Sequence, residues 1–171
     1  AAVAEVKTFR WKGTDAVTEL VKLLSSKTGG VRWRATYALG EIGEAVTELD
    51  PELMRERAVP ALVGALSDEH IRIRAAYALG QIGPEARAAI PELMKALEHE
   101  EQYFNGQAGH ALARIGEPAL EPLLEAVASG AGLRSLRSID VLGELGTVAS
   151  RRIVPALVAA FKQGNPDIQS R

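Results

Sequence analysis

The chain has 171 residues and a formal net charge of −2; 47% of its residues are hydrophobic, 25% are charged and only 5% are aromatic. This length suits one domain or one short array of repeats, and the charge balance excludes a large basic field of the kind that holds a nucleic-acid backbone. The absence of cysteine excludes disulfides, a thiol nucleophile and cysteine-ligated zinc; it is compatible with the cytoplasm and does not exclude an exported protein.

No run of apolar residues approaches the length of about 18 that a membrane-spanning helix requires, so we expect no membrane span. The chain opens with Ala-Ala-Val-Ala-Glu, without an initiator methionine or a basic leader, and we therefore expect it to be part of a longer or processed protein. Residues 1–30 predict a degenerate first repeat, in which Val3, Val6 and Phe9 face inward from a first helix and residues 15–24 form the second.

Two units then recur along the chain. Residues 31–43 read Val-Arg-Trp-Arg-Ala-Thr-Tyr-Ala-Leu-Gly-Glu-Ile-Gly and return at 71–83 as Ile-Arg-Ile-Arg-Ala-Ala-Tyr-Ala-Leu-Gly-Gln-Ile-Gly, with looser copies at 108–116 and 139–146. A second unit follows each copy, at 57–66, 88–97, 119–127 and 152–161, and residues 15–24 are a fifth example. Self-similarity at a step of about 30 to 40 residues is the signature of a stacked repeat protein.

Both units have the periodicity of amphipathic helices. In one second unit, apolar residues fall at positions i, i+3, i+4 and i+7, namely Ile90, Leu93, Met94 and Leu97. First helices are predicted to end at glycines that can act as caps, Gly43, Gly83, Gly116 and Gly146. Prolines stand near the predicted starts of second helices, where a missing N–H costs little, at Pro60, Pro91 and Pro155.

A second glycine stands one turn before three of these ends, at Gly40, Gly80 and Gly143. Glycine inside a helix costs about 1 kcal/mol relative to alanine, so we expect the paired helix to approach closely at these positions. The fourth repeat carries Ala113 there, which indicates that small size is the requirement.

One link is longer than the others, because residues 44–56 are inserted between Gly43 and Pro60. The insert contains Asp50-Pro51, a capping residue followed by proline at a first helical position. We interpret it as a surface loop with a short extra helix, and a binding insertion is the alternative.

The far end of the chain aligns with the start of another repeat, because residues 165–171 match residues 68–74. The predicted repeats are 1–30, 31–70, 71–100, 101–130 and 131–167, with residues 168–171 beginning a truncated sixth. A solenoid that stops there exposes an apolar face. We therefore expect the chain either to fray from its C-terminus or to self-associate end to end through the face that carries Val154, Leu157, Val158 and Phe161.

The pattern Ala-x-x-Ala-Leu-Gly-x-Ile-Gly, a short link, and then Ala-(Val/Ile)-Pro-x-Leu-x-x-Ala-Leu resembles the short HEAT repeat of phycobilin-lyase subunits, the PBS-lyase type, over roughly residues 14–171. The resemblance implies an all-α fold, a right-handed α-solenoid of about five antiparallel two-helix HEAT-like repeats. It does not specify a function, because such repeats occur in scaffolds of many kinds.

The sequence offers little for catalysis. His99-Glu100-Glu101 is the only local cluster of ligand-type residues, and without a second spaced histidine pair we expect no metal and no cofactor. Deoxyhypusine hydroxylase, a di-iron enzyme built from HEAT repeats, has His-Glu ligand pairs before an Ala-Tyr-x-Leu-Gly stretch like that at 76–80. Here those positions hold Trp33-Arg34, Ile73-Arg74, Gly106-Gln107 and Leu136-Arg137, and arginine cannot lose its proton to bind iron.

Two surfaces are candidates for binding another protein. The outward row of the second helices, which the resemblance places on the concave side, includes Glu92, Lys95, Glu125, Ala61 and Gly64. Its mixed charge and small residues disfavour the nucleic-acid groove that a HEAT-repeat DNA glycosylase would need. On the first helices, Trp33, Tyr37 and Tyr77 either form an exposed contact patch or fill the groove between neighbouring helices.

Arginines gather at the starts of first helices, and we expect most of them to form Asp–Arg ladders between repeats. The sequence thus predicts a non-catalytic protein-interaction scaffold. A phycobilin lyase or chaperone-like subunit is the alternative that the repeat subtype implies.

Overall fold

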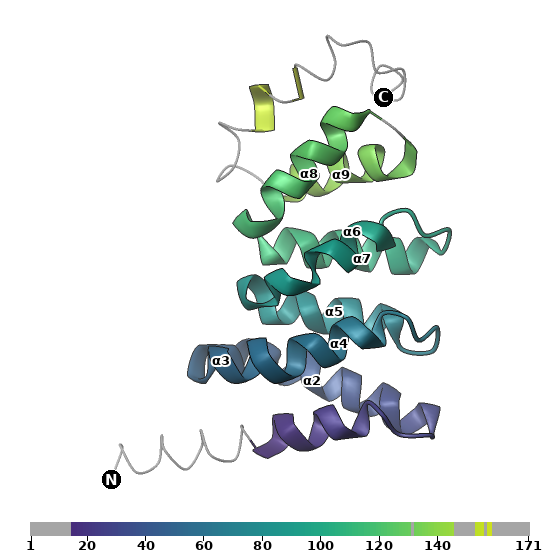
Figure 1. Ribbon diagram of the computed structural model, residues 1–171, viewed down its shortest axis with the longest axis vertical. Coiled ribbons are helices and arrows are strands. Elements are labelled where there is room, and N and C mark those ends of the chain that lie inside the picture. Colours follow the sequence, from purple (N-terminus) through teal and green to yellow (C-terminus); the bar gives the residue numbers. More distant parts are fainter. Residues whose placement is uncertain (1–14, 131, 146–152, 156, 159–171) are drawn as a thin grey trace.

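The computed structural model describes residues 15–130, 132–145, 153–155 and 157–158 of the chain, and these residues contain helices but no strand (Figure 1). Residues 15–23 form the first helix, and residues 153–155 and 157–158 are helical. The elements between them are α2 (Gly29–Leu49), α3 (Pro51–Leu53), η1 (Met54–Ala58), α4 (Val59–Ala65), α5 (Arg72–Ile82), η2 (Gly83–Ala89), α6 (Ile90–Ala96), α7 (Gln102–Ile115), α8 (Glu117–Ser129) and α9 (Gly132–Leu145).

The helices stack in two layers, as Figure 1 shows. In the first-helix layer, α2 contacts α5, α5 contacts α7, and α7 contacts α9. The second helices α4, α6 and α8 pack against this layer and carry the chain from one first helix to the next. This arrangement is an all-α repeat solenoid, which confirms the predicted fold class.

The core runs along the whole stack and is built from the predicted apolar positions. The four anchoring leucines of the first helices are at most 1% exposed: Leu39, Leu79, Leu112 and Leu142. The predicted stripe of α6, from Ile90 to Leu97, is likewise buried. Because full burial of one leucine contributes about 1.5–3 kcal/mol, each repeat adds to the stability of its neighbours through shared burial.

Two of the predicted glycine caps are confirmed and one is wrong. Gly83 and Gly116 end α5 and α7 with φ angles of 70° and 79°, a region that favours glycine. Gly43 does not end its helix, because α2 continues to Leu49. Gly146 lies outside the described residues.

The inner glycines mark close approaches between first helices. A Cβ atom on Gly40 would lie 3.0 Å from Tyr77 Cε1, and one on Gly80 would lie 3.1 Å from Ala111 Cα. The predicted close approach is thus confirmed at both positions, but its partner is the first helix of the next repeat and not the paired second helix. A Cβ on Gly143 would meet no described atom within 4 Å, so the described residues do not account for that glycine.

The insert at 44–56 is helical, and our interpretation of it as a surface loop is wrong. It lengthens α2 beyond Gly43, and α3, η1 and α4 then continue one another from Pro51 to Ala65. Val46 and Met54 are 6% and 0% exposed, so the insert adds to the core. The predicted cap is confirmed, because the Asp50 carboxylate accepts a hydrogen bond from the Leu53 N–H at 3.1 Å.

Prolines occupy the first turns of the second helices, as predicted. Pro60 and Pro91 lie at the second position of α4 and α6. The turn before Pro60, Met54–Ala58, is a π-helix, and the turn before Pro91 is a 3-10 helix. Since proline lacks an N–H and its ring crowds the preceding turn, these irregular turns are where the hydrogen-bond pattern adjusts.

Candidate functional site

The second-helix face carries a shallow hollow of about 450 Å³ between α6 and α8. It brings together Lys95 and Glu125, two residues of the predicted row. Its lining combines apolar and charged side chains: Ile90, Pro91, Met94, Lys95, Pro122, Glu125, Ala126, Ser129 and Arg134. Met94 and Ala126 are buried and form its apolar floor, whereas Lys95 and Glu125 are exposed at its edge.

The remaining residues of the predicted row lie outside this hollow. Glu92 forms an ion pair with Lys95 on the same helix, with Lys95 Nζ 2.7 Å from Glu92 Oε1. Ala61 is half-buried on α4, and Gly64 is exposed with no atom within 4 Å of a Cβ built on it. Gly64 thus leaves the row open at α4, and the described hollow lies between α6 and α8.

Trp33 and Tyr37 form part of the first-helix face. Each is 40% exposed, and their rings are stacked with centroids 5.8 Å apart. Arg74 of α5 lies over both rings, with its guanidinium carbon 4.4 Å from the Trp33 centroid and 5.2 Å from that of Tyr37. Such a cation–π arrangement fixes the guanidinium in place.

Tyr77 belongs mainly to the packing between first helices. Its ring fills the space beside Gly40, and its hydroxyl donates a hydrogen bond to Glu41 Oε1 at 3.3 Å. The two roles predicted for the aromatic residues are thus divided, because Tyr77 fills the groove whereas Trp33 and Tyr37 stay partly exposed.

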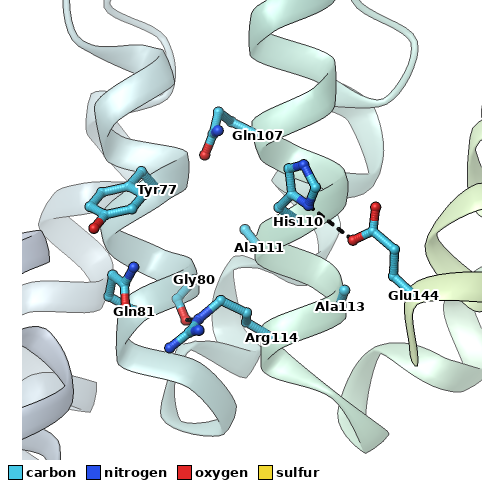
Figure 2. Close-up of a pocket in the computed structure, with 9 residues that line it drawn as sticks. All are labelled: Tyr77, Gly80, Gln81, Gln107, His110, Ala111, Ala113, Arg114 and Glu144. Atoms are coloured by element: carbon cyan, nitrogen blue, oxygen red, sulfur yellow. Dashed lines mark hydrogen bonds and ion pairs between the residues drawn. The ribbon is translucent and has the colours of Figure 1, made fainter. Parts of the chain in front are cut away.

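Two hollows line the first-helix face. One, of about 360 Å³, is lined by Trp33, His70, Ile73, Arg74, Tyr77 and Gln107; we call it the Arg74 hollow. The other, of about 400 Å³, is shown in Figure 2 and is lined by Tyr77, Gly80, Gln81, Gln107, His110, Ala111, Ala113, Arg114 and Glu144; we call it the Arg114 hollow. The two hollows share Tyr77 and Gln107.

Side chains from three helices define the Arg114 hollow (Figure 2). Gln107 and Arg114 reach from α7 toward α5, and Arg114 Nε donates to the Gly80 carbonyl at 2.9 Å. On the other side, His110 Nδ1 lies 2.9 Å from Glu144 Oε2 of α9. Sequence reasoning missed this hollow, because its members follow helical spacing only within each helix, and the stacking of the first helices brings the three sets together.

Charged contacts link successive repeats, but the predicted Asp–Arg ladder is confirmed only in part: among the described residues Arg32 pairs with an aspartate, whereas Arg72 and Arg134 pair with glutamates. Arg32 Nε lies 2.7 Å from Asp68 Oδ2, and Arg72 pairs with Glu101 at 2.6 Å. Burial by itself would raise the pKa of Asp68, but hydrogen bonds from Arg32 and from the His70 N–H, with the nearby positive charge, hold the pKa below its ordinary value of 3.8. Asp68 is therefore a carboxylate at neutral pH.

In the candidate metal cluster, His99 makes contacts with neighbouring residues of its own turn and of α7. His99 Nδ1 accepts a hydrogen bond from the Glu101 N–H at 3.1 Å, and its ring packs edge-to-face on Phe104. Within residues 15–145, wherever the structure describes them, no three histidine or acidic side chains converge as metal ligands would. Of the helices that the structure describes, none has the length and apolar character to cross a membrane.

Two family models match parts of the chain. Residues 59–141 match the family of HEAT repeats, and residues 31–82 match a HEAT-like repeat. No curated protein matches the chain. The solved structures that it resembles include the archaeal HEAT-like repeats protein from Thermococcus onnurineus NA1, at 20% identity and a TM-score of 0.57, over 80% of this chain and 62% of that one.

This likeness is one of fold, and the chain spans less than two thirds of the archaeal protein. The matches support HEAT-like repeats in general, and the PBS-lyase subtype stays a prediction. Parts of this chain, residues 59–141 and 31–82, thus match models of HEAT and HEAT-like repeats, and the fold is an all-α repeat solenoid.

Proposed function

We propose that the chain is a non-catalytic scaffold that binds another protein through its second-helix face. The observation that carries this proposal is the hollow between α6 and α8, where Lys95 and Glu125 border an apolar floor that includes Met94 and Ala126. HEAT repeats generally serve as protein-interaction scaffolds, and a shallow surface of mixed charge suits a helix or loop of a partner.

The proposal is tested by a charge exchange that leaves the net charge of −2 unchanged. A photo-cross-linking residue at position 129, an exposed position of the same lining that carries no charge, is used to capture a partner, which is then purified. We expect Lys95→Glu with Glu125→Lys to weaken that partner's binding at least about tenfold, because each charge would face the wrong group on the partner. Circular dichroism checks that the variant keeps its helices.

A matched control is Glu48→Lys, which changes an exposed residue of α2 and should leave the affinity unchanged. If the charge-exchanged variant and the wild type bound the partner with equal affinity, the second-helix face would not be the binding surface and the proposal would be wrong. A saturable change in the visible spectrum of phycocyanobilin on mixing with the chain would support the lyase alternative and contradict a non-catalytic role.

A further inference from the structure

Arg74 differs from the other partly buried arginines that the structure describes. Each of those has a carboxylate or a carbonyl oxygen as acceptor: Arg32, Arg55, Arg72, Arg134 and Arg137. Among the residues that the structure describes, Arg74 has neither, and its guanidinium lies over the rings of Trp33 and Tyr37. Because a partly buried cation is stabilised by an anion, this arginine has an unused capacity to bind one.

The guanidinium of Arg74 is also preorganised to bind such an anion. Stacking on aromatic rings occupies a face of the guanidinium and leaves the N–H donors in its plane for an acceptor. A side chain already packed over two rings loses less conformational freedom on binding than a free arginine does. The contact at 4.4 Å from the Trp33 centroid thus makes Arg74 a preorganised anchor.

The lining of the Arg74 hollow has the composition that recognises an acidic side chain. None of its six lining residues carries a carboxylate. His70 and Gln107 can donate further hydrogen bonds, and Trp33, Ile73 and Tyr77 supply apolar walls for the methylene groups of a ligand. Its volume of about 360 Å³ is in the range of sites that bind small groups.

We propose that the Arg74 hollow binds the carboxylate of an acidic side chain in a partner protein, and that the adjoining residues of that extended segment lie along the Arg114 hollow. Tyr77 and Gln107 border both hollows, so a segment can pass from one to the other. In the Arg114 hollow, the side-chain amide of Gln107 lies toward the gap between α5 and α7 (Figure 2), where it can pair with a peptide group of the segment.

The composition of the two hollows favours a carboxylate over a phosphate. Arg74 and Arg114 are the only arginines in the combined lining, which contains no lysine, and Arg114 already donates to Gly80 and lies 3.9 Å from Glu44. A nucleic-acid backbone or a phosphorylated peptide requires a larger cluster of cations, whereas one guanidinium fork matches one carboxylate. This site lies on the first-helix face and does not require the second-helix face to bind a partner.

The experiment uses the whole chain with Trp11→Phe, which leaves Trp33 as the only tryptophan, since the sequence has two. The probe is the blocked peptide acetyl-Ser-Asp-Leu-Ala-Ser-amide, titrated at low ionic strength, where exposed charges are least screened. We expect a saturable change in Trp33 emission and at least about tenfold weaker binding of the matching peptide with Asn in place of Asp.

Variants then locate the site. Arg74→Gln should weaken binding of the Asp peptide at least about tenfold, measured by the anisotropy of a labelled peptide because this substitution also alters Trp33 emission. Arg87→Gln, which changes an exposed arginine of η2 outside both hollows, should leave the affinity unchanged. Arg74→Lys, which keeps the charge but loses the planar fork, should give an intermediate loss.

Several results would overturn the proposal: equal binding of the Asp and Asn peptides, unchanged affinity of Arg74→Gln, or no saturable binding up to about 1 mM peptide. Tighter binding of a phosphoserine peptide or of an oligothymidylate than of the Asp peptide would also overturn it and assign the hollow to phosphate. The exchange of Lys95 and Glu125 should not affect peptide binding, so failure of the second-helix proposal is distinguishable from failure of this one.

Discussion

At the scale of single residues, the helical glycines of this chain have opposite surroundings. Gly80 lies against the backbone of the next first helix, where a Cβ would be 3.1 Å from Ala111 Cα, whereas a Cβ on Gly64 of α4 would meet no atom within 4 Å. We expect Gly80→Leu to lower the free energy of unfolding by about 1–3 kcal/mol, because the larger side chain must push two helices apart. Chemical denaturation measures this loss.

Gly64→Leu is the matched control for Gly80→Leu. It places the same side chain in a helix without a neighbour, so it should be neutral or raise the free energy of unfolding by up to about 1 kcal/mol, the difference in helix propensity. Equal effects of the two substitutions would mean that the spacing of the first helices does not depend on Gly80.

At the scale of helices, the start of α3 depends on one side chain. Asp50 caps this helix by accepting a hydrogen bond from the Leu53 N–H at 3.1 Å. We expect Asp50→Ala to lower the free energy of unfolding by about 0.5–2 kcal/mol, as the loss of such a cap does elsewhere. Asp50→Asn retains an acceptor oxygen and should keep most of the stability in the same denaturation experiment.

The helices themselves could be predicted because the apolar period of each unit is repeated. Ile90, Leu93 and Met94 are buried where the period places them, and the Asp50-Pro51 signal for a helix start was correct. The continuation of α2 through Gly43 could not be predicted. A glycine cap and a glycine at a close helix contact look alike in a sequence, and burial of Val46 and Met54 depends on neighbouring elements that the insert does not reveal.

The candidate site could likewise be predicted only in part. Lys95 and Glu125 were identified because they follow one phase on equivalent helices, and the structure places them at one hollow. The Arg74 hollow combines residues of α2, α5 and α7. Trp33 and Tyr77 were recognised as candidates, but stacking of Arg74 on Trp33 depends on the register between two first helices, which no periodicity within one helix determines.

At the scale of the whole molecule, each repeat is stabilised by its neighbours, and charged contacts at the helix starts add to the apolar packing. Arg32 and Arg72 lie at corresponding positions of α2 and α5, and each pairs with a carboxylate that precedes the next first helix, Asp68 and Glu101. Arg32 also donates to the carbonyl oxygens of Ser26 and Lys27, at 2.9 and 3.3 Å. The Arg32–Asp68 pair therefore joins the turn before α2 to the turn before α5.

This arrangement predicts how the stability of the array depends on pH. The pKa of Asp68 is lowered in the folded chain, so its charged form stabilises the fold. That contribution is fully present above the ordinary value of 3.8 and is lost as pH falls through the lower folded value. We expect Asp68→Asn to lower the free energy of unfolding at pH 7, and this difference from the wild type to shrink as the pH falls below about 4.

Urea denaturation at several pH values measures the difference in the free energy of unfolding between wild type and Asp68→Asn. The control is Glu100→Gln, at an exposed position, which should be nearly neutral at pH 7. A difference between wild type and Asp68→Asn that stayed constant down to about pH 2, with both chains still folded, would show that the charge of Asp68 does not stabilise the contact between the repeats.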